Sequence, residues 1–211
     1  MHKEHVTNHK VECSSCHVQI EHSLVAGVRE QQTHGARFST DSGTCGQCHE
    51  QTHNGPREMF QGIGGKGVSD MPSPMARARV NCIACHMTKE NSDQKADVVG
   101  QTFVATQDRC DYCHGEKYKG TLADWKKLIE TNLSKAEAAL RDAKADADRA
   151  RLRGEPGLQV QRLLDDADYN VRFVRLGRGI HNVTYATALL NVAQERCRSA
   201  ETILTTQSGN P

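Results

Sequence analysis

The chain has 211 residues, of which 36% are hydrophobic and only 4% aromatic, and its formal net charge is +1. The aromatic share is small for a core built from protein side chains alone, and the near-zero charge does not favour nucleic-acid binding. No stretch approaches the roughly 20 apolar residues of a membrane-spanning helix, and no signal peptide opens the sequence.

One pentapeptide pattern, Cys-x-x-Cys-His, occurs four times, at residues 13–17, 45–49, 82–86 and 110–114. Two thiols three positions apart can reach the two vinyl groups of one porphyrin, and the next imidazole can then bind the iron. Zinc knuckles and disulfides are the alternatives, but neither requires a histidine after every second cysteine. The pattern therefore predicts four covalently bound haem c groups.

The pattern assigns most of the cysteines to haem attachment. The predicted attachment residues are Cys13, Cys16, Cys45, Cys48, Cys82, Cys85, Cys110 and Cys113. The predicted proximal iron ligands are His17, His49, His86 and His114. Of the nine cysteines only Cys197 is left over, and we expect it to be a reduced, buried residue of a helix.

Residues 1–120 are rich in histidine, glycine and proline and lack long helical periodicity. We expect them to form a haem-packed core with extensive loop. The glycine run at 62–67 follows no strand and lacks the Gly-Lys-Ser/Thr ending of a phosphate loop. It predicts a loop whose backbone can pass close to a porphyrin.

Histidines exceed the number that four haems need. Eleven histidines minus four proximal ligands leave seven for four distal positions, which favours bis-histidine ligation throughout. Two imidazoles keep iron low-spin and lower its potential relative to histidine–methionine ligation. The candidate distal ligands are His5, His9, His22, His53 and His181. His2 and His34 are assigned to solvated positions or to partner-facing ligands, and Met59, Met71, Met75 and Met87 are alternative ligands.

From Leu122 onward the sequence becomes helical in character. Apolar residues recur at three- and four-residue steps, which predicts one helix to about Arg153, a second from about Leu158, and a third from about Asn182 to Thr202. We expect residues 121–211 to form a C-terminal helical hairpin that packs on itself or on the haem region, with pairing to another subunit as the alternative. The predicted fold class is therefore mainly α.

Two local patterns resemble known cytochromes. The run of His2, His5 and His9 before the first motif resembles the openings of cytochrome c3-like and NapC/NrfH-type multihaem cytochromes, in which upstream histidines ligate other haems. Gly179-Ile-His181-Asn182 is similar to the helical C-terminus of pentahaem nitrite reductases and their relatives, where this histidine ligates a haem. The Cys-x-x-Cys-Lys motif of those reductases and the NapC-type membrane anchor have no counterpart here. Size and haem count resemble extracellular tetrahaem cytochromes that polymerise into nanowires.

These features predict electron transfer through four closely stacked bis-histidine haems. Because haem c is attached on the oxidising side of the cytoplasmic membrane, we expect a periplasmic or extracellular location and an export signal that has been removed. The expected partners are redox proteins, with self-association into a filament and docking to a quinol-oxidising membrane subunit as two arrangements. The alternative function is a reductase of nitrite or hydroxylamine with one open haem iron.

Overall fold

The computed structural model describes residues 3–10, 50–89 and 103–208. The chain divides into two compact units, one formed by Met1–Glu50 and Ala78–Lys119, the other by Gln51–Arg77 and Gly120–Pro211. Of the described residues, 79% are helical, which confirms the expected mainly α fold. No helix in this described part has both the length and the apolar character needed to cross a membrane.

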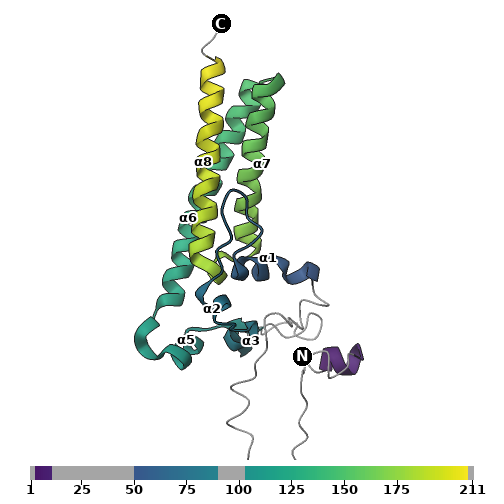
Figure 1. Cartoon of the computed structure of the whole chain (residues 1–211), viewed down its shortest axis with the longest axis vertical. Coiled ribbons are helices and arrows are strands. Elements are labelled where there is room, and N and C mark those ends of the chain that lie inside the picture. The colour runs from purple at the N-terminus through teal and green to yellow at the C-terminus, as the bar shows by residue number, and fades with distance from the viewer. Residues whose placement is uncertain (1–2, 11–49, 90–102, 209–211) are drawn as a thin grey trace, which may run out of the picture. The chain divides into compact units, whose positions relative to one another are not determined.

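Three long helices dominate the second unit: α6 (Thr121–Ala150), α7 (Gly154–Leu176) and α8 (Val183–Ser208). They lie side by side and alternate in direction (Figure 1). The chain leaves α6 through Arg151, which has a left-handed backbone with φ of 47°. Pro156 lies in the first turn of α7, where its missing N–H has no intrahelical partner to lose. The three helices that the apolar period predicts are therefore observed, with bounds within a few residues of those expected.

The core of this unit lies where the apolar faces of the three helices meet. Burying one large apolar side chain contributes about 1.5–3 kcal/mol, so these contacts outweigh the weak intrinsic stability of the single helices. The described apolar residues that are buried are Met59, Ile129, Ala136, Leu140, Ala143, Val160, Leu164, Ala167, Val171, Phe173, Val174, Tyr185, Ala186, Leu189, Leu190, Ala193, Cys197, Ala200 and Leu204. The expected burial of Cys197 is thus observed.

A segment from the N-terminal half also belongs to the second unit. Helix α1 (Glu50–Gln61) crosses the end of α7, and a Cβ atom on Gly55 would lie only 3.2 Å from the Cα of Gly177. Residues 62–73, which we call the strap, follow α1, loop over α7 and α8 (Figure 1), and lead into α2 (Pro74–Arg77). The division of the chain thus differs from a single boundary at residue 120, because the strap bonds to the C-terminal helices.

The described part of the first unit is built from short elements. They are η1 (Lys3–Asn8), α3 (Cys82–Cys85), β1 (His86–Lys89), β2 (Phe103–Ala105), α5 (Gln107–His114) and η5 (Gly115–Tyr118). Strands β1 and β2 pair antiparallel, with His86 opposite Ala105 and a bulge between His86 and Thr88. This pairing brings the segments that carry the third and fourth motifs together.

Candidate functional site

The third Cys-x-x-Cys-His motif forms one helical turn that leads directly into a strand. The side-chain oxygen of Asn81 caps α3 by accepting a hydrogen bond from the Ile83 N–H at 3.4 Å. Cys82 and Cys85, three positions apart, share one face of this turn. His86 ends the helix with its N–H bonded to the Cys82 carbonyl oxygen. Both thiols and the imidazole therefore come from one short, capped segment.

The fourth motif occupies the C-terminal half of α5. Cys110 and Cys113 again lie one turn apart, and His114 is the last residue of the helix. The His114 ring meets Tyr118 edge-on, with the two ring centroids 4.9 Å apart. The Nε2 atom of Gln107 donates to the Tyr118 carbonyl oxygen at 2.9 Å, which holds η5 against α5. The aromatic contact and this hydrogen bond both stabilise the backbone that flanks His114.

The two motifs lie next to each other within the first unit. Arg109 Nε donates to the carbonyl oxygen of Ala84 at 3.4 Å and so links α5 to α3. Burial raises the pKa of Cys85, and the charges that Cys110 and Cys113 would carry raise it further. Burial also raises the pKa of Cys110. The cysteines of the two motifs are thus close enough for the charge of one to affect another.

The residues of this unit fit covalently attached haem. Cys82, Cys85, Cys110 and Cys113 are all free of disulfide bonds, and each pair has the spacing that thioether attachment requires. Among the described residues, α3, α5 and η5 contain no buried side chain. These elements thus have no protein core of their own in that part, and a porphyrin would supply the apolar surface against which they could pack.

His181 lies in the 3-10 turn η6 (Gly179–Asn182), between α7 and α8, and is half-buried. Its Nδ1 is 3.0 Å from the carbonyl oxygen of Gly177 and 2.9 Å from that of Arg178. Because a carbonyl oxygen can only accept, the ring proton of the neutral imidazole lies on Nδ1 and the lone pair on Nε2. A metal-ligating histidine typically donates its other ring N–H in this way. The geometry therefore suits an iron ligand.

The other predicted ligands lie partly or wholly outside the described residues. His9 is exposed just after η1. His5 belongs to η1 and His53 to α1, and the side chains of both lie outside the described part. The residues wholly outside it are Cys13, Cys16, His17, His22, Cys45, Cys48 and His49. Met59, an alternative ligand, is fully buried in the helical core. The assignments of the predicted ligands stay predictions.

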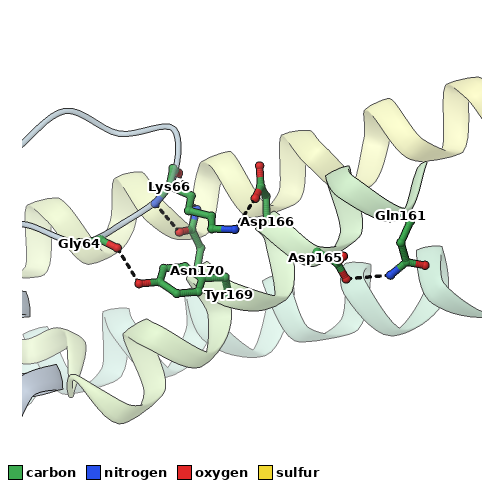
Figure 2. A network of polar contacts seen from close by, with 7 residues as sticks. All are labelled: Gly64, Lys66, Gln161, Asp165, Asp166, Tyr169 and Asn170. Atoms are coloured by element: carbon green, nitrogen blue, oxygen red, sulfur yellow. Dashed lines mark hydrogen bonds and ion pairs between the residues drawn. The ribbon is translucent and has the colours of Figure 1, made fainter. Parts of the chain in front are cut away.

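Polar side chains that the sequence analysis did not single out bind the backbone of the strap. The Lys66 N–H donates to Asn170 Oδ1 at 2.9 Å, and Asn170 Nδ2 donates back to the Lys66 carbonyl oxygen at 2.8 Å (Figure 2). The Gly65 N–H donates to the Tyr185 hydroxyl oxygen at 2.9 Å. Asn170 and Tyr185 are both completely buried. In the sequence, Asn170 stands out only as a polar residue on the apolar face of its helix.

The strap leaves no room for a side chain where it crosses α8. A Cβ atom on Gly65 would lie 2.2 Å from Leu189 Cδ2 and 2.7 Å from the Tyr185 hydroxyl. The glycine-rich sequence therefore permits close backbone approach, as expected, but the approach described is to the protein's own helices.

Comparison with known proteins agrees with this description. The sequence profile of the cytochrome c552 family matches residues 68–210. Among solved structures, the crystal structure of the outer cell wall cytochrome OcwA is similar, with a TM-score of 0.50 and 23% identity over 73% of this chain. The chain spans about one third (34%) of the length of that protein. None of the curated proteins matches the sequence.

The family match covers the last part of the strap, both described motifs and all three long helices. Such a match implies covalently bound haem c. It also confirms the expected relationship to nitrite-reductase-like cytochromes. The chain belongs to the cytochrome c552 family and is a multihaem c-type cytochrome.

Proposed function

We propose that the chain conducts electrons through four covalently attached haem c groups, each ligated by two histidines. Bound haem supplies reversible one-electron chemistry at its iron. The contact between α3 and α5 supports this proposal most directly, because Arg109 Nε bonds to the Ala84 carbonyl oxygen at 3.4 Å. Attachment points on two touching helices favour electron exchange between the haems that they hold.

The residues of each motif have the same roles in this proposal. The two cysteines would hold the porphyrin through thioether bonds, and the histidine would ligate the iron. Of the proposed distal ligands, which also include His5, His9, His22 and His53, His181 has the best-defined geometry. The hydrogen bonds from its Nδ1 to the carbonyl oxygens of Gly177 and Arg178 make the imidazole a stronger electron donor. A stronger donor stabilises ferric iron and lowers the potential of that haem.

The location and the partners follow from the chemistry of haem attachment. Because haem c is attached on the oxidising side of the cytoplasmic membrane, we infer a periplasmic or extracellular protein. The similar structure is named as an outer cell wall cytochrome, in keeping with this location. Redox proteins would load and unload the haems, and either a filament of identical chains or a quinol-oxidising membrane subunit could provide the neighbouring centre.

Low-temperature EPR of the oxidised holoprotein, calibrated against its haem content, tests the proposal. We expect only low-spin signals, because every iron would carry two imidazoles. In His181→Ala, one haem should become high-spin. The matched control is His34→Ala, which removes a histidine that is not among the proposed distal ligands and should leave all signals low-spin.

A high-spin signal of one haem per unaltered chain would contradict complete bis-histidine ligation. It would favour the alternative, a reductase of nitrite or hydroxylamine with an open iron. Because the cytochrome c552 family includes nitrite reductases, reductase assays would follow that outcome directly.

A further inference from the structure

Asn182, which directly follows His181, is buried and makes two hydrogen bonds with its side-chain amide. Its Nδ2 donates to the carbonyl oxygen of Met71 in the strap at 2.6 Å. Its Oδ1 accepts from the N–H of Tyr185 at 3.2 Å, in the first turn of α8. One amide thus joins the turn η6 to the strap on one side and to α8 on the other.

The backbone around His181 is also fixed. The His181 N–H donates to the Arg178 carbonyl oxygen at 2.9 Å, which closes the turn. A Cβ atom on Gly179 would lie 2.9 Å from the Cβ of Ala186, so the turn packs tightly against α8. A distortion of this turn would change the distance from the His181 ring to the carbonyl oxygens of Gly177 and Arg178.

The strap provides a firm support for Asn182 because α7 holds it independently. Tyr169 Oη donates to the Gly64 carbonyl oxygen at 2.9 Å, and the Lys66 ammonium pairs with Asp166 at 2.7 Å (Figure 2). The buried amide of Asn170 adds two bonds to the backbone of Lys66. Asn182 is therefore the point at which an already anchored loop meets the turn that carries the proposed ligand.

We propose that Asn182 is a positioning residue for the haem that His181 ligates. It locks η6 to the strap and so keeps the Nδ1 proton of His181 on its carbonyl acceptors. This inference rests on the proposed role of His181 as a distal ligand. Without the amide, η6 can shift, the Nδ1 hydrogen bonds weaken, and the imidazole becomes a poorer donor to ferric iron. The midpoint potential of that one haem should then rise.

The holoprotein variants Asn182→Ala and Asn170→Ala form a matched pair. Each removes a buried asparagine that bonds to the strap backbone, at Met71 and Lys66 respectively. Both should lower the thermal unfolding temperature, because each leaves strap backbone groups without their partner. Only Asn182→Ala should shift the EPR g-values of one low-spin haem and raise its midpoint potential in a redox titration, because Asn170→Ala leaves the Asn182–Met71 bond and the strap contacts of Tyr169 and Asp166 in place.

Asn182→Ser is the second variant, used in particular if Asn182→Ala does not fold. Its hydroxyl can still accept from the Tyr185 N–H but is too short to reach the Met71 carbonyl oxygen, and because the side chain stays neutral the same shifts are expected. Unchanged g-values and potentials in the folded Asn182 variant, or equal shifts in Asn170→Ala, would overturn the positioning role.

His181→Ala separates this inference from the proposed function. If every haem stays low-spin in that variant, the ligand assignment fails, and the positioning role fails with it. If one haem becomes high-spin while the Asn182 variants leave all spectra and potentials unchanged, only the positioning inference fails.

Discussion

Cys197 is the one cysteine outside the four motifs, and its environment makes it unreactive. It is 1% exposed in α8, and burial raises its pKa to about 11. At pH 8, well below this pKa, the thiol stays protonated, so the reactive thiolate is scarce. We expect no alkylation of the folded holoprotein by iodoacetamide and one equivalent in guanidinium, because thioether bonds would have consumed the other eight cysteines.

The same measurement counts the haems. Each motif without a haem adds two thiols, so three reactive thiols in the denatured chain would contradict the proposed four haems, each attached through two thioethers. Cys197→Ser is the control that should remove the last reactive thiol. Rapid alkylation of the folded protein at Cys197 would show that α8 does not bury this residue.

Residue roles could be predicted from the sequence only where the pattern is local. Cys82, Cys85 and His86 lie within five residues of one another, so their spacing alone indicates the chemistry. Asn170 and Asn182 bond to carbonyl oxygens 104 and 111 residues away, and nothing near them in sequence indicates these partners. The distal ligands share this difficulty, because a distal histidine and its haem need not be close in sequence.

Helix α1 depends on its contact with α7. Gly55 and Pro56 both lower the intrinsic helix preference of this segment. A Cβ atom on Gly177 would lie 2.8 Å from the carbonyl oxygens of Gly55 and Phe173. We expect Gly177→Ala to lower the free energy of unfolding by about 1–3 kcal/mol, because the added methyl group must push backbone atoms apart. Displaced from α7, α1 should also be cleaved faster by trypsin after Arg57.

Leu176→Ala, one position earlier, is the control for this change. Leu176 is 67% exposed at the end of α7. Its truncation should change the free energy of unfolding by no more than about 0.5 kcal/mol and leave tryptic cleavage unaltered. If thermal melts and cleavage rates of the two variants were the same, α1 would not be docked through the glycine pair.

The three long helices could be predicted from the sequence, whereas α1 and the strap could not. Helices α6, α7 and α8 each bury one face, and this leaves a three- to four-residue apolar period in the sequence. Tertiary contacts determine α1 instead, and hydrogen bonds to side chains of α7 and α8 determine the strap. Such contacts leave no periodic pattern.

The two units of the chain differ in how many of their residues are buried. The buried apolar residues described all belong to the second unit, here called the helical unit, and no residue described in the first, motif-bearing unit is buried. A chain produced without haem attachment should therefore keep a helical far-UV circular dichroism spectrum and a cooperative thermal transition. Proteolysis of this apoprotein should concentrate on residues 78–119, and the holoprotein should resist it there.

A non-cooperative melt of the apoprotein would contradict this expectation. It would mean that the helical unit also needs haem to fold. Equal protease resistance of residues 78–119 with and without haem would instead show that the motif-bearing segment has enough protein contacts of its own.

The strap also sets an order of events during biogenesis. Its hydrogen bonds to Asn170 and Tyr185 join residues that are separated by 104 and 120 positions in the sequence. The last Cys-x-x-Cys-His motif, in contrast, ends at residue 114. A chain that is exported from its N-terminal end would therefore present every proposed attachment cysteine before Asn170 and Tyr185 emerge. Contacts over such separations also form late, since they must close long loops. Cofactor attachment can thus precede closure of the helical unit without any separate device that delays folding.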